Sequence, residues 1–295
     1  MKYSRIIVTA FNDRWLNSAV SAFCGYGSSV IGCDAEVGLE KLIPANETID
    51  RRPGASLLVF GFSKDGLQTA IANRTGQCLM TCPTTAVFDG LCDSETEDNK
   101  SGNNESKVDK ISLGKHLRYF GDGYQKSKLI GSRRFWRIPV MDGEFVVEDM
   151  VGIGKGVAGG NFLVLASDQS AGLLAAERSV DAIADLPNVI TPFPGGVVRS
   201  GSKVGSKYAD LRASTSDAYC PTLRGRVESA LADNVNCVYE LVIDGTDFDS
   251  VSIAMKVGIE TAVGEGIVSI SAGNYGGKLG KHHFHLRELF ATSRQ

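Results

Sequence analysis

The chain has 295 residues, of which 43% are hydrophobic and 22% are charged, and its formal net charge is −3. This composition is ordinary for a soluble globular protein, and the length allows two lobes or domains. The small negative charge argues against nucleic-acid binding, which normally requires a basic domain or stripe. Asn12, Asp13 and Arg14 interrupt the first apolar run, so the start predicts neither a signal peptide nor a membrane span, and we expect a cytoplasmic protein.

The first half of the chain alternates strand and helix patterns. One helix is expected after Asp13 as its N-cap, and a second is expected after Ser63. Apolar runs predict strands at Ile6–Ala10, Val30–Cys33, Leu57–Phe62 and Cys78–Cys82. The predicted order is therefore strand, helix, strand, strand, helix, strand.

The second half repeats this order. Apolar residues at helical spacing predict one helix through Leu173 and Ile183 and another through Val251 and Ala262. The expected strands are Phe162–Ala166, Val189–Thr191, Cys237–Ile243 and Ile267–Ala272. Two βαββαβ units in tandem predict an α+β fold of two ferredoxin-like lobes, residues 1–140 and 141–295. The alternative is a coincidental α+β pattern without this duplication.

A polar segment, residues 93–110, lies within the first predicted lobe and contains one apolar residue, Val108. Such a segment cannot bury itself, so we expect a mobile insertion. Order is expected to return over Leu117–Val147, with Phe120–Gln125 as a turn and Arg134–Val140 as a strand. The basic residues around it either meet an acidic ligand or lie on a solvated strand face; they are Lys126, Lys128, Arg133, Arg134 and Arg137.

The seven cysteines are an odd number in a long chain, which indicates reduced thiols rather than a disulfide framework. Cys78, Cys82 and Cys92 lie near one another, but their spacing is not CxxC. Cys78 and Cys82 lie in an apolar run, where Cys often acts as a small core residue. His283 and His285 would share one strand face, yet no acidic or cysteine partner is near them in sequence. We therefore predict no metal site.

The stretch 191–208 is the least periodic part of the chain, with two prolines, four glycines and three serines beside Arg199, Lys203 and Lys207. Pro and Gly shape the backbone here, and the amides and cations suit an anionic or carbonyl-bearing ligand. The glycine spacing and the order Gly-Ser-Lys do not match a phosphate-binding P-loop. A structural Gly-rich turn is the alternative.

A second glycine run, Gly154, Gly156 and Gly159, spells GxGxxG but precedes a predicted strand. A dinucleotide fingerprint requires a strand before the glycines and a helix after them. The run therefore indicates a close-packed connection or a rim loop. A nucleotide-binding enzyme is disfavoured by both glycine motifs.

Glu240 is a carboxylate inside the apolar strand CVYELVI. Alternation places it on one face with Val238 and Val242, opposite Tyr239 and Leu241. Burial is costly for an unpaired carboxylate and raises its pKa, so that it can act as a proton donor or shuttle. A solvated face, or pairing with a Lys or Arg, is the alternative.

Seven blocks spread over nearly the whole chain together resemble the formylmethanofuran:tetrahydromethanopterin formyltransferase family, which includes a subunit of a bacterial formyltransferase/hydrolase complex. The blocks are Gly76–Gly90, Phe120–Gln125, Gly143–Phe162, Phe193–Lys207, Ala213–Thr222, Cys237–Gly245 and Ser271–Gly280. The resemblance implies reversible transfer of a formyl group between methanofuran and N5 of tetrahydromethanopterin. These two compounds are substrates, and no metal or permanently bound cofactor is implied.

The resemblance also implies two ferredoxin-like lobes and a homo-oligomer, a dimer of dimers. Formyl transfer between amines passes through a tetrahedral intermediate, which needs donors for the oxyanion and a group that manages the amine protons. By its motif, Glu240 resembles the family's catalytic carboxylate, with an acid role. The alternative is a non-catalytic pterin-binding or assembly subunit of a formyltransferase/hydrolase complex.

The same motifs imply a substrate cleft near a subunit interface, with cations that hold the anionic tails of both substrates. The residues assigned to it by position in the matched blocks are Phe193, Gly195, Gly196, Ser202, Lys203, Ser206, Lys207, Asp122, Tyr124, Asn274, Tyr275 and Lys278.

Two departures limit this resemblance. Family members usually carry a segment ahead of the first strand, whereas this strand begins close to Met1, so either the gene start is wrong or that strand is lost. The polar insertion puts the usual oligomer contacts nearby in question. The direction of transfer stays open between an archaeal and a bacterial role, although the near-neutral charge and the cysteine content favour the bacterial one.

Overall fold

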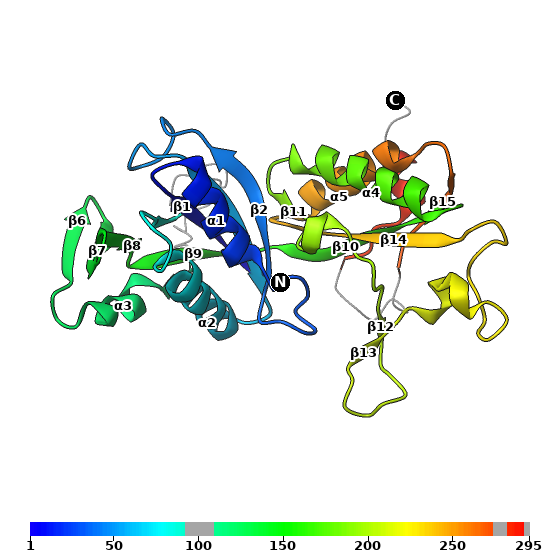
Figure 1. The fold of residues 1–295 in the computed structure, drawn as a ribbon, viewed down its shortest axis with the longest axis horizontal. Coiled ribbons are helices and arrows are strands. Elements are labelled where there is room, and N and C mark those ends of the chain that lie inside the picture. The colour runs from blue at the N-terminus through cyan, green and yellow to red at the C-terminus, as the bar shows by residue number, and fades with distance from the viewer. Residues whose placement is uncertain (92–108, 274–281, 292–295) are drawn as a thin grey trace, which may run out of the picture. The chain divides into compact units, whose positions relative to one another are not determined.

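The computed structural model describes residues 1–91, 109–273 and 282–291 (Figure 1). The chain forms two compact units, Met1–Gly156 and Val157–Gln295. Both units combine strands and helices, which confirms the predicted α+β class. Within the described ranges, no helix is long and apolar enough to cross a membrane.

The first unit begins with the predicted order of strands and helices. The elements are β1 (Lys2–Thr9), α1 (Asp13–Cys24), β2 (Glu36–Ile43), β3 (Gly54–Gly61), α2 (Lys64–Arg74) and β4 (Ala86–Asp89). The strands pair antiparallel in the order β2-β3-β1-β4. Each of the two helix crossovers therefore returns the chain to a strand that is not adjacent to the one it left.

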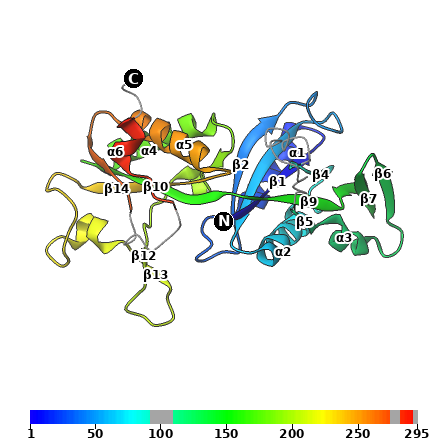
Figure 2. The same cartoon turned by 180° about the vertical axis from the view of Figure 1, so that it is seen from behind.

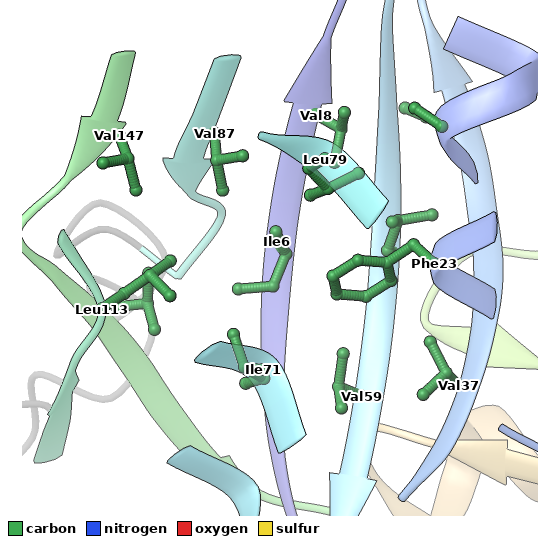
Figure 3. Close-up of a cluster of buried hydrophobic side chains, with 14 of the residues drawn as sticks. Ile6, Val8, Phe23, Val37, Val59, Ile71, Leu79, Val87, Leu113 and Val147 are labelled. Atoms are coloured by element: carbon green, nitrogen blue, oxygen red, sulfur yellow. The ribbon is translucent and has the colours of Figure 1, made fainter. Parts of the chain in front are cut away.

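The core of the first unit lies between this sheet and its two helices (Figure 3). Ile6 and Val8 occupy alternate positions of β1 and so point to the same face, as does Val59 of β3. Phe23 of α1 and Ile71 of α2 pack against that face. All five side chains are almost fully buried, so the helices are held mainly by apolar packing.

The remainder of the first unit extends the sheet. Its elements are β5 (Asp109–Ser112), α3 (Gly114–Leu117), β6 (Lys126–Ile130), β7 (Arg133–Val140), β8 (Gly143–Glu148) and β9 (Met150–Lys155). β8 pairs parallel with β4 and continues through β7 to β6. β9 pairs with both β1 and β5. The predicted strand Arg134–Val140 is confirmed as most of β7.

Both helices of the first βαββαβ unit begin at side-chain caps. Ser63 accepts a hydrogen bond from the Gly66 amide at 3.1 Å, as predicted. The cap of α1 is Asn12 and not Asp13, because Asn12 has extended backbone angles and its side chain accepts from the amide of Trp15. Asp13 is instead the first helical residue, where its charge favours the helix N-terminus.

Two predicted strands of the first unit are wrong. Val30–Cys33 forms a turn, in which the amide of Cys33 donates to Ser29 at 2.8 Å, and β2 starts at Glu36. Cys78–Cys82 does not form a strand because α2 runs on into a π-helical turn, Thr75–Leu79. The apolar side chains of that turn pack on the core as a helical face does, and β4 supplies the strand instead.

The polar insertion ends earlier than the sequence predicts. Asp109 and Lys110 belong to β5 and pair with Ile153 and Gly152 of β9. Residues 93–108 lie outside the described ranges. The basic cluster beyond the insertion is partly neutralised, because Arg133 pairs with Glu148 at 2.6 Å and Arg137 pairs with Glu144 at 2.5 Å. All five basic residues of the cluster lie on the β6–β7 hairpin.

The second unit contains the predicted succession of strand, helix, strand, strand, helix and strand, with a short hairpin inserted and a helix added at the end. Its elements are β10 (Val157–Ala166), α4 (Gln169–Ala184), β11 (Val189–Ile190), β12 (Lys203–Val204), β13 (Ala213–Ser214), β14 (Cys237–Gly245), α5 (Phe248–Ala262), β15 (Ile267–Ser271) and α6 (Leu286–Ala291). The main sheet has the antiparallel order β11-β14-β10-β15, while β12 and β13 form a separate hairpin.

Helices α4 and α5 cover one face of the second sheet. Phe162, Tyr239 and Leu241 point from β10 and β14 into the core that these helices close. Asp168 and Asp247 cap the two helices by accepting amide hydrogen bonds at 2.9 and 2.7 Å. α6 packs against the same core, beside α5 (Figure 2). The opposite face of the sheet is left for the cavity described below.

The two compact units divide after Gly156, whereas the sequence analysis places the lobe boundary after Val140. The difference arises because β8 and β9 pair with β4 and β1 and so belong to the first unit. Gly154 lies inside β9, where an added Cβ would come within 2.3 Å of the Tyr3 ring. This supports a close-packed role for that glycine rather than a dinucleotide fingerprint.

A buried ion pair joins three strands of the first unit. Arg5 of β1 donates two hydrogen bonds to the carboxylate of Glu40 on β2, at 2.8 and 2.9 Å. Ser56 of β3 donates a third at 2.6 Å. Glu40 lies where the pairing of β2 with β3 shifts register, and such a bulge redirects a side chain. Glu40 is 5% exposed, and a carboxylate buried to this extent needs such hydrogen-bond partners.

Replacing Glu40 with Ala is expected to lower the free energy of unfolding by about 3 kcal/mol, because it leaves the Arg5 charge buried without its carboxylate. Urea unfolding followed by circular dichroism would measure the change. Asp109→Ala, which breaks the exposed Lys64–Asp109 pair, is the matched control and should change stability far less. Equal effects of the two variants would contradict a stabilising role for the buried pair.

Candidate functional site

A cavity of about 320 Å³ opens in the second unit. Its floor contains Leu163 of β10 and Val238 and Glu240 of β14. These side chains alternate with the residues that face α4 and α5, so the cavity lies on the opposite side of the sheet from the helices. The walls come from three loop segments, Val198–Lys203, Ser216 with Tyr219–Thr222, and Gly273.

Glu240 lies on a central strand and is 4% exposed. Its amide donates to the carbonyl of Val198 at 3.1 Å, and the amide of Val198 donates to the Glu240 carbonyl at 2.7 Å. On its other side, Glu240 pairs with Leu163 in the β10–β14 ladder. The alternation predicted from the sequence is therefore confirmed, and the carboxylate belongs to a fixed part of the cavity.

The loop that follows Val198 forms the polar wall of the cavity. Gly201 adopts a left-handed conformation with φ +55°, which turns the chain between Ser200 and Ser202. Lys203 then enters β12, where it pairs with Ser214 of β13. The wall thus presents two serine hydroxyls and a lysine close to a buried carboxylate, an arrangement suited to a polar or anionic ligand.

The lysine of this wall is held by an acidic side chain. Nζ of Lys203 donates to Oδ2 of Asp217 at 2.6 Å. The other carboxylate oxygen, Oδ1, accepts a hydrogen bond from the Ala218 amide at 3.1 Å. The hydrogen bond from Lys203 is the main cause that lowers the pKa of the Asp217 carboxyl below its ordinary value. Asp217 therefore stays ionised when the pair is formed.

The structure brings three of the predicted site residues together, since Glu240, Ser202 and Lys203 line the cavity. Other predicted residues of the same loop lie outside its lining. They are Phe193, Gly195, Gly196, Ser206 and Lys207. Ser206 accepts a hydrogen bond from the Tyr208 amide at 3.0 Å, and Lys207 is exposed.

The remaining predicted residues belong to other parts of the chain. Asp122 and Tyr124 lie in the first unit, in the turn after the 3-10 helix Arg118–Gly121, and Tyr124 is 78% exposed. Asn274, Tyr275 and Lys278 are outside the described residues, although Gly273 just before them lines the cavity. The roles assigned to all these residues stay predictions.

Sequence reasoning missed several residues that build the cavity. Ser216, Tyr219 and Thr222 line the cavity. They belong to the block Ala213–Thr222, which resembles the family but from which no single residue was predicted as a site residue. Asn161 of β10 is 7% exposed, and its side-chain oxygen accepts a hydrogen bond from the Gly273 amide at 2.8 Å. A polar residue inside an apolar strand was the available signal for Asn161, as it was for Glu240.

Residues 1–91, 109–273 and 282–291 contain no group of three His, Cys, Asp or Glu side chains placed to hold one ion. His283 and His285 are exposed, with ring centroids 6.4 Å apart. The six described cysteines are free thiols, and Cys220 is the one among them that lines the cavity.

The two predicted glycines of the loop are constrained for different reasons. Both have positive φ, +62° for Gly195 and +75° for Gly196. A Cβ on Gly195 would meet nothing within 4 Å, whereas a Cβ on Gly196 would lie 2.7 Å from both methyl groups of Val180 on α4. Gly196 is therefore required by packing, and Gly195 only by backbone conformation.

Gly196→Ala is expected to destabilise the protein by about 2–4 kcal/mol, since it adds overpacking against Val180 to the cost of the left-handed backbone. Gly195→Ala carries only the backbone cost, about 1–2 kcal/mol, and is the matched control. Denaturant unfolding of both variants tests the difference. If Gly195→Ala were the more damaging change, the close contact with α4 would not be the constraint.

Two family models match the chain. Residues 1–140 match the one described as formylmethanofuran-tetrahydromethanopterin formyltransferase, and residues 143–289 match the one described as FTR, proximal lobe. A protein from Methylococcus capsulatus named formylmethanofuran–tetrahydromethanopterin formyltransferase is 50% identical over 295 residues, covering 99% of this chain and 94% of the relative. A protein of the same name from Methanocaldococcus jannaschii is 47% identical, covering 97% of this chain and 93% of the relative.

Solved structures agree with these relatives. The formyltransferase from Methanosarcina barkeri superposes with a TM-score of 0.88 at 42% identity, covering 98% of this chain and 94% of that one. A chain of the formyltransferase/hydrolase complex from Methylorubrum extorquens, solved with methylofuran, gives a TM-score of 0.89 at 44% identity, covering 98% and 92%. The sequence, the fold and the cavity around Glu240 lead to one conclusion: the chain belongs to the formylmethanofuran–tetrahydromethanopterin formyltransferase family.

Proposed function

We propose that this chain is an enzyme that reversibly transfers a formyl group between methanofuran and N5 of tetrahydromethanopterin. The observation that carries the proposal is a carboxylate, Glu240, that is 4% exposed in the floor of a polar-walled cavity. Curated relatives at 47–50% identity over nearly the whole chain bear the name of this activity.

The transfer forms one C–N bond and breaks another. The acceptor amine attacks the formyl carbon, the carbonyl oxygen becomes an oxyanion in a tetrahedral intermediate, and the donor amine leaves with a proton. We assign to Glu240 the acid role, in which it delivers a proton to the intermediate and recovers the one lost by the attacking nitrogen. Its place on a central strand supports this role, because proton transfer requires a fixed donor.

The polar wall is proposed to bind the substrates themselves, with no permanently bound cofactor. Ser202 offers a hydroxyl, and Arg199 and Lys203 offer positive charge on the same loop. Cations at this wall would attract the anionic tails that the family's substrates carry. The other predicted binding residues, including Asp122, Tyr124, Asn274, Tyr275 and Lys278, are retained as candidates for the same substrates.

We further propose that each unit contains one ferredoxin-like lobe. Support comes from the equal strand orders, β2-β3-β1-β4 and β11-β14-β10-β15, each joined by the same succession of strands and helices. A homo-oligomer is proposed from the family resemblance. Additional partner subunits are proposed because the relative from Methylorubrum extorquens was solved as part of a formyltransferase/hydrolase complex. The odd number of cysteines supports a reducing compartment, the cytoplasm.

Glu240→Gln is expected to lower kcat by about 10²–10⁴-fold, because the amide keeps the shape of the side chain but cannot transfer the proton. Formyl transfer from formylmethanofuran to tetrahydromethanopterin, followed by absorbance, measures the rate. Binding of tetrahydromethanopterin, measured by calorimetry, should change little. Glu228→Gln alters an exposed carboxylate of the same unit and is the control.

The outcomes separate the two candidate functions. If the wild type turns over and Glu240→Gln retains full activity, the chain is an enzyme but Glu240 is not its acid. A wild type that binds the pterin without turning over would favour an assembly subunit, and the assay would then be repeated with candidate partner subunits present.

A further inference from the structure

An acidic residue, Asp217, lies beside the cavity wall and has no part in the proposed formyl transfer. Asp217 lies next to Ser216, which lines the cavity, and its carboxylate pairs with Lys203 of the same wall. We propose that Asp217 is a positioning residue, which holds the ammonium group of Lys203 at the cavity for an anionic group of the substrate. This inference rests on the proposed function and assigns one more residue to its binding site.

The backbone places Lys203 in the cavity wall and Asp217 directly after a lining residue, Ser216. Lys203 pairs with Ser214 in the β12–β13 hairpin, and three residues later the chain turns into the 3-10 helix Asp217–Tyr219. Tyr219, at the end of that turn, lines the cavity as Lys203 does. The 2.6 Å contact between Nζ of Lys203 and Oδ2 of Asp217 therefore joins the start and the end of the segment 203–217. Lining residues stand at both ends of this segment.

Asp217 is itself held in place. Its amide donates to the carbonyl of Thr215 at 2.9 Å, and its Oδ1 accepts from the amide of Ala218. One carboxylate oxygen is therefore fixed by the turn and the other is presented to Lys203. A carboxylate held in this way restrains a long side chain that would otherwise sample many rotamers.

The pairing leaves Lys203 able to bind a ligand. An ammonium group has three N–H donors, and Asp217 takes one of them, so two stay available for a carboxylate or phosphate of the substrate. Because the lysine is ordered before the ligand arrives, less conformational freedom is lost on binding. This is the physical basis of the expected gain in affinity.

An opposite effect competes with positioning, since Asp217 also neutralises the charge of Lys203. The side chains of Lys203 and Asp217 are 46% and 34% exposed. Water and salt therefore weaken the repulsion between Asp217 and an anionic ligand. We expect positioning to be the larger effect. The two effects change KM in opposite directions, which makes them separable by experiment.

Asp217→Asn is expected to raise KM for the substrate that contacts Lys203 about 3-fold while kcat stays within about 2-fold, which is the scale of an exposed ion pair. KM is measured for formylmethanofuran and for tetrahydromethanopterin separately. Asp217→Glu should restore KM, since it returns the carboxylate. In a Lys203→Ala background, Asp217→Asn should have no further effect, because the partner it acts through is gone.

A matched control lies in the first unit. Arg137 and Glu144 form an ion pair at 2.5 Å with side-chain exposures of 47% and 38%, close to those of the Lys203–Asp217 pair. Glu144→Gln removes a comparable surface charge interaction and should leave both KM values unchanged. Similar KM changes in Glu144→Gln and Asp217→Asn would show that the effect is not specific to the cavity, and would overturn the proposal.

Other results would also overturn it. A fall in KM for Asp217→Asn would mean that the carboxylate competes with the substrate, and a fall in kcat alone would mean a role other than positioning. Dissociation constants for both substrates, measured by isothermal titration calorimetry, test Asp217 independently of turnover. If the wild type were inert, the proposed function would fail, yet a 3-fold weaker constant in Asp217→Asn would still support positioning. Absence of saturable binding to the wild type, or equal constants, would exclude it.

Discussion

The arrangement of the cavity depends on two backbone hydrogen bonds between Val198 and Glu240, at 2.7 and 3.1 Å. β14 is paired on both sides within its sheet, so Glu240 has little freedom to move. The loop that leaves Val198 next joins a strand ladder at Lys203, in the β12–β13 hairpin. Because one residue supplies both the buried carboxylate and the anchor of the loop, neither can shift without the other.

Polar side chains help to fix irregular segments in the second unit, beside the backbone hydrogen bonds of the turns. Asp168 and Asp247 start the two helices, Asn161 secures Gly273, and Asp217 secures Lys203. In each case an oxygen accepts from a donor that regular secondary structure does not satisfy. The sheet and helices are held together by apolar packing. The polar contacts attach the loops of the cavity wall to this rigid scaffold.

Sequence patterns predicted the second unit better than the first, and the reason is physical. The second unit has long strands and amphipathic helices, in which the spacing of apolar residues and the length of the segment indicate the same element. Val30–Cys33 and Cys78–Cys82 are short apolar runs, which suit a turn or a helical face as well as a strand. Glu240 could be predicted because alternation places it on one strand face.

Asp217 could not be found in the same way. Its partnership with Lys203 joins residues on either side of a hairpin whose strands are two residues long, too short to give a periodic signal. The Arg5–Glu40 pair was equally hidden, since its geometry depends on a bulge in β2. Ion pairs between side chains on irregular backbone, such as these two, could therefore not be predicted from the sequence alone.

The strand at one end of the first sheet has a further consequence. β6 is exposed along its whole length and carries Lys126 and Lys128 beside the apolar Leu129 and Ile130. A strand at the end of a sheet offers unpaired peptide groups to any passing chain, and lysines discourage such pairing because two like-charged edges repel. Lys126 and Lys128 are therefore placed to oppose edge-to-edge pairing at a strand whose apolar side chains alone would favour it.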